Sequence, residues 1–421
     1  MAVIWYFIIG CLIIIIISII IFSINQHNQH NQHNQIIQTS KIYDIYPTVK
    51  QNNVHYPLEL AQNLYKFPIL SKNGLNQNVA IFSFGSWWYY YYKKFNNFDS
   101  LINTLKINIP NFNAEINFIK GNKFNPTMDN IDSDKNEALL DIGIISSCCP
   151  YINKIYVFCI SLDDIPENLK YCVDNNINVI NISYSVQSSL PITDKVDDSL
   201  FQDYYKNLTI CVSSGDFGGC IYKNGICIKN VNYPTSSNYV LSCGGVQPNL
   251  DKYSEENSNT WNHSPISAWS KDGSGGGGVS KYISRPSWQI FNNNLLNKDY
   301  PNNRLVPDVS GLAFPTWYLP IKSNKNKNFF AGGTSAVAPL YSSFFIIVNQ
   351  TRELANLPPI GFVNKILYEL NDKYYNIYFN DIKTGTIHSG YSAGENYDLA
   401  TGIGVLNAEK LYNYLIKYNK M

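Results

Sequence analysis

A serine at the expected start of a helix is the residue of this chain best suited to act as a nucleophile. Ser335 stands in Gly332-Gly333-Thr334-Ser335-Ala336-Val337-Ala338-Pro339, and the apolar stretch 340–349 that follows is typical of a helix. Glycines before such a serine leave room for a substrate backbone, and the first amides of the helix can bind an oxyanion. The same pattern also fits a small-residue helix start packed against a sheet. Only a catalytic base near the serine would distinguish a nucleophile from such a structural residue.

The base expected for such a serine is a histidine, but the six histidines do not supply one. Three lie in a polar repeat, and His55, His263 and His388 fall in polar, loop-like sequence. A carboxylate then has to replace the histidine. Glu137 and Asp141 lie four residues apart, on one face of an expected helix, where two carboxyls can share a proton. An exposed acidic face is the alternative, but the apolar residues around this pair indicate a mostly buried helix.

A third acidic side chain follows an expected strand. Asp216 comes directly after the apolar run 208–213, in the sequence Ser214-Gly215-Asp216. Loops that leave the carboxyl ends of parallel strands hold the active sites of open α/β sheets. A protonated carboxyl there can donate a hydrogen bond to an oxyanion. The other interpretation is that Asp216 is a turn residue that caps a loop.

The elements that must position these residues follow an alternating pattern. After about Tyr56, apolar runs alternate with helical segments, which predicts a parallel sheet with helices on both faces. The expected strands are 79–84, 115–119, 154–160, 179–184, 208–213, 239–244 and 305–310. The glycine-rich run Gly273–Ser280 is expected to be a linker, or a loop whose main chain closely approaches a ligand.

Composition and charge exclude several classes of function. The 421 residues are 45% hydrophobic and 15% charged, which excludes a disordered chain. A net charge of +1 gives no basic surface, so no nucleic-acid partner is expected. The glycine run also lacks the Lys-Ser/Thr of a phosphate-binding loop.

Nine cysteines are too few for a disulfide scaffold in a chain of this length. Cys220 and Cys227 flank a short turn and are the most plausible pair if the compartment is oxidising. Cys211 and Cys243 fall in apolar runs that look like buried strands, where a free cysteine behaves as a small hydrophobe.

The start of the chain is an uncharged, isoleucine-rich stretch over 4–24, about as long as a helix that crosses a bilayer. A cleavable signal peptide is the alternative, but no basic region precedes the stretch and no Ala-x-Ala site follows it. Asn-Gln-His triplets with His27, His30 and His33 come next and predict a flexible spacer. We therefore expect a membrane anchor and spacer over 1–36 and one further domain over 37–421. This predicts a single-pass membrane protein whose domain faces the lumen or the exterior.

The order of the motifs resembles that of the sedolisin family, the serine-carboxyl peptidases. Glu137 and Asp141 match the family's Glu-x-x-x-Asp, Ser214–Asp216 matches its Ser-Gly-Asp, and Gly333–Ala336 matches its Gly-Thr-Ser-Ala. Further matches in family order are 57–68, 275–280, 285–289, 306–310 and Gly404. The resemblance implies a subtilisin-like α/β fold with a parallel sheet of about seven strands flanked by helices, here preceded by the transmembrane helix, and makes 37–421 a peptidase domain.

The resemblance also assigns a role to each site residue. It makes Ser335 the nucleophile, Glu137 the general base and later acid, Asp141 its orienting partner and Asp216 the oxyanion-hole donor. It implies hydrolysis of peptides or proteins through an acyl-enzyme, by an endopeptidase or a tripeptidyl-peptidase. Acidic pH is expected, because Asp216 must be protonated to donate.

Two other functions are weighed against this one. The first is a catalytically silent, membrane-anchored surface or virion protein that uses the same fold as a binding scaffold. Retention of all four catalytic side chains argues against it. The second is an ordinary Ser-His-Asp hydrolase, which would need His263 or His388.

One calcium ion near the C-terminus is also implied by the resemblance. Its ligands would be the side chains of Asp381 and Asp398 and the main-chain carbonyls of Ile382, Gly394 and Asn396. Calcium prefers such oxygen ligands. The family usually has glycine at the position of Asn396, and asparagine tolerates a left-handed backbone better than most residues.

Family members usually carry a long N-terminal prodomain. Here about thirty polar residues separate the expected membrane span from the first motif of the domain. Either folding needs no prodomain, or a separately encoded prodomain or inhibitor is a partner of this chain.

Overall fold

The computed structural model describes residues 57–84, 99–123, 131–184, 198–223, 226–248, 266–270, 273–291, 299–300, 302–314, 317–322 and 328–419. The chain divides into two units, Met1–Val49 with Ile69–Ser71, and Lys50–Pro68 with Lys72–Met421. Of the first unit only Ile69–Ser71 is described. The fold reported below is therefore that of the second unit.

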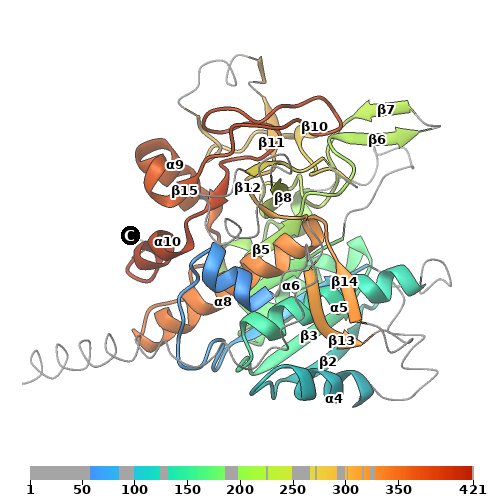
Figure 1. Cartoon of the computed structure of the whole chain (residues 1–421), viewed down its shortest axis with the longest axis vertical. Helices are drawn as coiled ribbons and strands as arrows, with labels where there is room; N and C mark the ends of the chain where they lie inside the picture. The colour runs from blue at the N-terminus through green and yellow to red at the C-terminus, as the bar shows by residue number, and fades with distance from the viewer. Residues whose placement is uncertain are drawn as a thin grey trace, which may run out of the picture. The chain divides into compact units, whose positions relative to one another are not determined.

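A mostly parallel sheet forms the centre of this unit (Figure 1). Its strands are β1 (Asn78–Ser83), β2 (Glu115–Lys120), β3 (Lys154–Cys159), β4 (Val179–Ile182), β5 (Thr209–Ser213), β8 (Leu241–Pro248), β9 (Ile266–Ala268), β12 (Val309–Leu312), β15 (Phe379–Asn380) and β16 (Val405–Leu406). They run in the order β15-β16-β12-β8-β5-β4-β1-β3-β2, with β9 paired to β8 as a branch. Neighbours from β16 to β2 are parallel, whereas β9 and β15 pair antiparallel.

The described sheet therefore has ten strands, not the seven that the sequence predicted. Six predicted strands are confirmed as β1 to β5 and β8. The seventh, 305–310, divides at Pro307 into β11 (Asn303–Val306) and β12, because proline has no N–H to give to the ladder. The three further strands, β9, β15 and β16, are two or three residues long, which is too short for a periodic pattern to reveal.

Three antiparallel pairs lie outside this sheet in the described residues. β6 (Cys220–Lys223) pairs with β7 (Ile226–Lys229), β10 (Gly278–Ser284) with β11, and β13 (Trp317–Lys322) with β14 (Asn328–Ala331).

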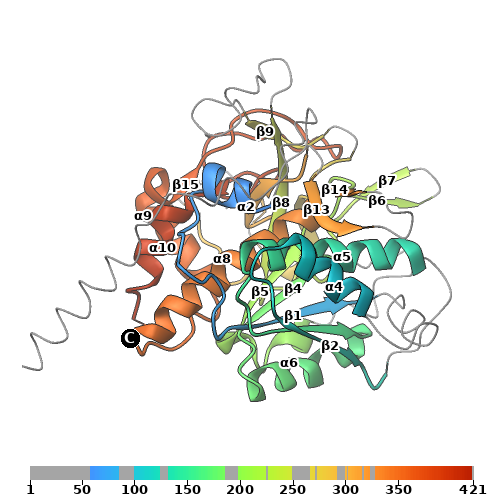
Figure 2. The same cartoon turned by 60° about the horizontal axis from the view of Figure 1, so that its bottom comes forward.

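Helices cover both faces of the sheet, as predicted (Figure 2). The helical segments are α2 (Pro57–Glu59), η1 (Leu60–Leu64), α4 (Asp99–Asn108), α5 (Ile131–Cys148), η2 (Leu162–Asp164), α6 (Ile165–Asp174), η4 (Asp198–Phe201), η5 (Tyr205–Asn207), α8 (Thr334–Leu354), α9 (Asn364–Tyr378) and α10 (Ala408–Leu415). α6 packs on one face, where its apolar residues join a cluster with Phe82, Phe158 and Ile180. α5 and α8 pack against each other and against strands on the opposite face. Cover on both faces explains why the central strands are apolar throughout.

The carboxylate of Asp308 ties β12 to its neighbours. Arg304 and Asp308 are both fully buried, and the Arg304 guanidinium donates to both Asp308 carboxylate oxygens, at 2.8 and 2.6 Å. The same carboxylate accepts from the Ser242 amide, the Asn364 side chain and the Tyr368 hydroxyl. A buried ion pair is tolerated when further hydrogen bonds satisfy its atoms, as they do here. This network gives Asp308, the aspartate of the motif at 306–310, a structural role.

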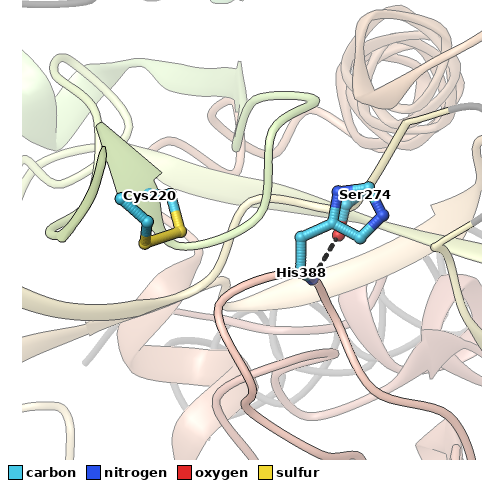
Figure 3. Close-up of a disulfide and its surroundings, with 4 residues drawn as sticks. Cys220, Ser274 and His388 are labelled. Carbon is cyan, nitrogen blue, oxygen red and sulfur yellow. Dashed lines mark hydrogen bonds between the residues drawn. A yellow bond between two sulfur atoms is a disulfide. The ribbon is translucent and has the colours of Figure 1, made fainter. Parts of the chain in front are cut away.

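The predicted cysteine pair is confirmed. Cys220 and Cys227 form a disulfide across the β6–β7 hairpin (Figure 3). Cys211 on β5 and Cys243 on β8 are free and fully buried, as their apolar context predicted.

The predicted N-terminal anchor requires a correction. Among the described residues no helix combines the length and the apolar character needed to cross a membrane. This finding contradicts the predicted transmembrane helix and, with it, the predicted single-pass membrane location. The segment 4–24 and the histidine-containing spacer lie outside the described residues, so the boundary between 1–36 and 37–421 stays a prediction.

Candidate active site

Ser335 lies at the N-terminal end of α8, as the sequence predicted. It is the second residue of the helix and is 7% exposed. The helix is apolar and buried from Thr334 to Gln350, and it packs on β4, β5, β8 and β12. The Ser335 hydroxyl donates to the main-chain oxygen of Ser183, 3.2 Å away. The sheet and the helix together therefore hold this hydroxyl at the carboxyl end of β4.

Asp216 lies three residues beyond the end of β5 and is attached to the same helix start. Its Oδ1 accepts from the amide and from the hydroxyl of Thr334, at 2.8 and 2.7 Å. The Thr334 hydroxyl also accepts from the Gly215 amide at 3.0 Å. Gly333 has φ +97°, and a Cβ there would lie 2.2 Å from Asp216 Oδ2, so only glycine fits. Thr334 therefore fixes the Asp216 carboxyl next to the Ser335 backbone.

The glycine run that the sequence singled out is a loop that supports Asp216. The Ser274 amide donates to the main-chain oxygen of Asp216 at 2.9 Å, and the Gly276 amide donates to that of Gly215 at 2.7 Å. A Cβ at Gly276 would lie 2.0 Å from the Ser214 oxygen. The glycines therefore let this loop approach the main chain of residues 214–216, and the resulting hydrogen bonds hold the Ser-Gly-Asp loop in place.

The two remaining carboxyls come from α5. Asp141 is fully buried, and its Oδ1 lies 2.5 Å from the Ser183 hydroxyl, which follows β4. Glu137 is half-buried and lies one turn earlier on the same face of the helix. The helix is buried from Ala138 to Cys148, which confirms the mostly buried helix predicted around this pair.

Burial sets the protonation of both aspartates. It raises the pKa of Asp141 from 3.8 to about 8, against the smaller lowering effect of the hydrogen bonds between Asp141 and the side chains of Ser183 and Asn181. Desolvation of the Asp216 carboxyl likewise raises its pKa, although the bonds from Thr334 act in the opposite direction. Both side chains therefore hold protons at pH values where a solvated aspartate is ionised.

The start of α8 thus connects Ser335 to Asp141 through Ser183 and to Asp216 through Thr334. Sequence reasoning found Ser335, Asp141 and Asp216 but gave no role to Thr334 or Ser183. The sequence held one signal for Ser183. It is a polar residue at the end of the apolar strand β4, and the next long strand, β5, leads to Asp216.

His388 takes no part in this arrangement. It is the only histidine within the described ranges, it is exposed, and its Nε2 lies 3.1 Å from the main-chain oxygen of Ser270. Its amide donates to the Ser274 hydroxyl at 2.9 Å (Figure 3). His55 and His263 lie outside the described residues. The described histidine therefore supports the glycine loop and makes no hydrogen bond to Ser335.

The five residues predicted to bind calcium lie in two neighbouring loops. The Asn396 amide donates to Asp381 Oδ2 at 3.2 Å, and the Gly394 amide donates to Asp398 Oδ2 at 3.0 Å. Asn396 has φ +63°, the left-handed conformation that the family glycine would adopt. Ile382, directly after Asp381, is buried. The two carboxyls and the three residues with predicted carbonyl ligands are therefore close together.

The charge balance of these loops bears on whether a cation fits. Burial raises the pKa of Asp398 to about 7, which a nearby cation would reverse. Lys383 is the nearby basic group, with Nζ 3.9 Å from Asp381 and 3.3 Å from Glu395. No cluster of three or more His, Cys, Asp or Glu side chains suited to a metal occurs in the described chain. The predicted site has two such side chains, those of Asp381 and Asp398. Their oxygen atoms suit calcium, and calcium binding stays a prediction.

The fold and the site define a protein of the subtilisin-like α/β class whose helix-start serine is linked to buried carboxyl groups. No protein-family model matches the chain. Tripeptidyl-peptidase 1 of Dictyostelium discoideum is 30% identical over 311 residues, covering 67% of this chain and 47% of that protein. Kumamolisin of Bacillus sp. (strain MN-32) is 34% identical over 206 residues, covering 47% of this chain and 34% of that protein. The chain thus spans about half the length, or less, of these curated relatives.

A solved structure supports the fold. The serine-carboxyl proteinase sedolisin from Pseudomonas superposes with a TM-score of 0.67 over 86% of this chain and 98% of its own, at 23% identity. Together with the curated relatives, this match shows that the chain belongs to the sedolisin family.

Proposed function

We propose that this chain is a serine-type peptidase that cleaves peptide bonds in acid through Ser335, Glu137 and Asp141, with Asp216 in the oxyanion hole. The observation that supports the proposal best is the pair of connections made at the start of α8. One leads from the Ser335 backbone to Asp141, and the other leads through Thr334 to Asp216. Two buried carboxyls, whose pKa values burial raises, are thus joined to the helix start that carries Ser335. The relatives named as peptidases favour the same reaction.

In this proposal Glu137 is the general base. Two carboxyls one turn apart on α5 do not ionise together easily, and burial raises the pKa of Asp141 to about 8. In this proposal the proton of the pair therefore stays on Asp141, and Glu137 acts as the base. Proton transfer to Glu137 frees the Ser335 oxygen from its bond to the Ser183 carbonyl and lets it attack the scissile carbonyl.

The attack forms a tetrahedral intermediate with a negative oxygen. A protonated Asp216 donates a hydrogen bond to this oxygen. The Ser335 amide is a second donor, because the first N–H groups of α8 have no acceptor within the helix. Glu137 then returns its proton to the leaving amine, the acyl group stays on Ser335, and water releases it by the reverse sequence.

The proposal is tested by the dependence of hydrolysis on pH. The whole chain is incubated with a fluorogenic peptide library from acidic to neutral pH. We expect activity in acid that falls as the pH rises through the folded-state pKa of Asp216, because the ionised carboxyl no longer donates. Activity that increases toward neutral pH would contradict the role of Asp216.

A binding scaffold is the competing function, and the site does not favour it. A scaffold has no need for a helix-start serine joined through hydrogen bonds to two buried carboxyls. A folded, calcium-loaded protein that hydrolyses no peptide at any pH would nevertheless support the scaffold and contradict the peptidase.

We also propose one calcium ion held by the carboxyls of Asp381 and Asp398 and the carbonyls of Ile382, Gly394 and Asn396. The ion would supply structural stability rather than chemistry, because it would join loops next to β15 and β16. At a hundredfold excess over its Kd, a ligand stabilises the folded state by about 2.7 kcal/mol. Chelation is therefore expected to lower the Tm by several degrees, measured by calorimetry with and without added calcium.

Two variants make the calcium experiment specific. Asp381→Asn removes one charge from the site and should abolish the calcium-dependent part of the Tm. Asp174→Asn removes a carboxylate that pairs with exposed Lys170 on α6, and it should keep the full calcium response. A parent Tm that does not change with calcium or chelator contradicts the site.

A further inference from the structure

We propose that Ser183 is a positioning residue for the reaction, which holds the Asp141 carboxyl and the main chain of Ser335 in one hydrogen-bonded unit. This inference rests on the proposed peptidase function. It concerns a residue at the end of β4 to which neither the motifs nor the roles above give a part in catalysis.

Ser183 is 5% exposed and lies at the point where α5, α8 and β4 meet. Its hydroxyl oxygen is 2.5 Å from Asp141 Oδ1 on α5 and 3.2 Å from the main-chain oxygen of Ser335 on α8. The side-chain amide of Asn181, two residues earlier on β4, donates to the same hydroxyl at 3.2 Å. Three elements are therefore joined through one oxygen atom.

The count of protons determines the direction of these bonds. A serine hydroxyl has one proton to donate, and it has two oxygen neighbours that need a donor. An ionised Asp141 would take that proton and leave the Ser335 carbonyl without it. A protonated Asp141 instead donates to Ser183, which is then free to donate to the Ser335 carbonyl. Only the protonated aspartic acid completes both bonds, and burial, by raising its pKa to about 8, keeps it in that state.

The link between Ser183 and the nucleophile is reciprocal. The Ser335 hydroxyl donates to the main-chain oxygen of Ser183, while the Ser183 hydroxyl reaches the main-chain oxygen of Ser335, both at 3.2 Å. Two bonds between two residues restrict rotation at the start of α8 more than one bond would. Glu137 lies on the same helix as Asp141, and Asp216 is held separately by Thr334.

Kinetics of Ser183→Ala test the positioning role. Loss of the hydroxyl leaves Asp141 without its partner and loosens the helix start, so kcat is expected to fall about ten- to a hundredfold while KM changes little. Ser183→Thr keeps a hydroxyl on the same carbon and should restore most of kcat. Ser147→Ala is the matched control, because the buried Ser147 hydroxyl donates to the Gly143 oxygen within α5. A Ser183→Ala protein with parental kcat overturns the proposal.

A measurement of unfolding separates this inference from the proposed function. Urea midpoints are compared for the parent, Ser183→Ala, Asp141→Ala and the double variant. If the two side chains act as a unit, the double variant loses clearly less than the sum of the single losses. If the losses of stability are additive and the parent is active, the role of Ser183 is overturned but the peptidase function is not. If the parent is inactive, both the peptidase function and the role of Ser183 are overturned.

Discussion

Replacing Ser335 by alanine is expected to abolish peptide hydrolysis in acid, lowering kcat by about ten-thousandfold or more. The variant lacks the oxygen that forms the acyl-enzyme, and no neighbouring hydroxyl takes its place: Ser183 and Thr334 are committed to Asp141 and Asp216. Initial rates on a fluorogenic peptide that the parent cleaves provide the measurement. Ser335 is small and its hydroxyl makes one long bond, so we expect the variant to fold like the parent.

A serine on the same helix supplies the control. The Ser343 hydroxyl donates to the Pro339 oxygen within α8 and does not contact the site. Ser343→Ala should therefore keep the parental rate, and far-ultraviolet circular dichroism should show the same helix content in all three proteins. Parental rates from a folded Ser335→Ala protein would show that the nucleophile lies elsewhere.

The layered arrangement of this unit could be predicted because local patterns carry it. Strands such as β1 and β3 are buried on both faces and therefore appear as uninterrupted apolar runs. Ser335 was found from the glycines that precede an expected helix start, and Asp216 from its place after an expected strand. Gly333 has a further role that the sequence did not show, because any larger residue there would collide with the Asp216 carboxyl.

The contacts between elements could not be predicted in this way. Ser183 and Thr334 matter because β4 lies beside β5 in the sheet and the start of α8 packs over both. Strand order depends on packing over the whole domain, and a pattern of apolar residues along one strand does not contain it. The short strands β15 and β16 were missed for the same reason: two residues become a strand only where a partner is present.

The length and apolar character of 4–24 predicted a transmembrane helix, and the described residues, which do not include this segment, contain no membrane-spanning helix. Backbone preference did better at Asn396, whose left-handed conformation follows from the tolerance of asparagine for that region.

Replacing Asp216 by alanine is expected to lower kcat by about a hundred- to a thousandfold with little change in KM, the usual cost of losing one oxyanion-hole donor. The effect should be confined to kcat because Asp216 interacts with charge that develops only in the transition state. Steady-state kinetics in acid, where the parent carboxyl is protonated, provide the measurement. A variant whose KM rises while kcat is unchanged would place Asp216 in substrate binding instead.

Asp216→Asn separates the protonation of Asp216 from its position. The asparagine oxygen can still accept from Thr334, and its amide donates at any pH. Burial raises the folded-state pKa of Asp216, so the protonated carboxyl contributes its full stability below the ordinary aspartate pKa of 3.8 and loses it as the pH rises through the folded-state pKa. The Tm of Asp216→Asn should therefore rise relative to that of the parent as the pH increases. The activity that this variant keeps should not show the fall with rising pH that ionisation of Asp216 causes in the parent. If its Tm and its rate fall with pH as those of the parent do, another group controls the acid dependence.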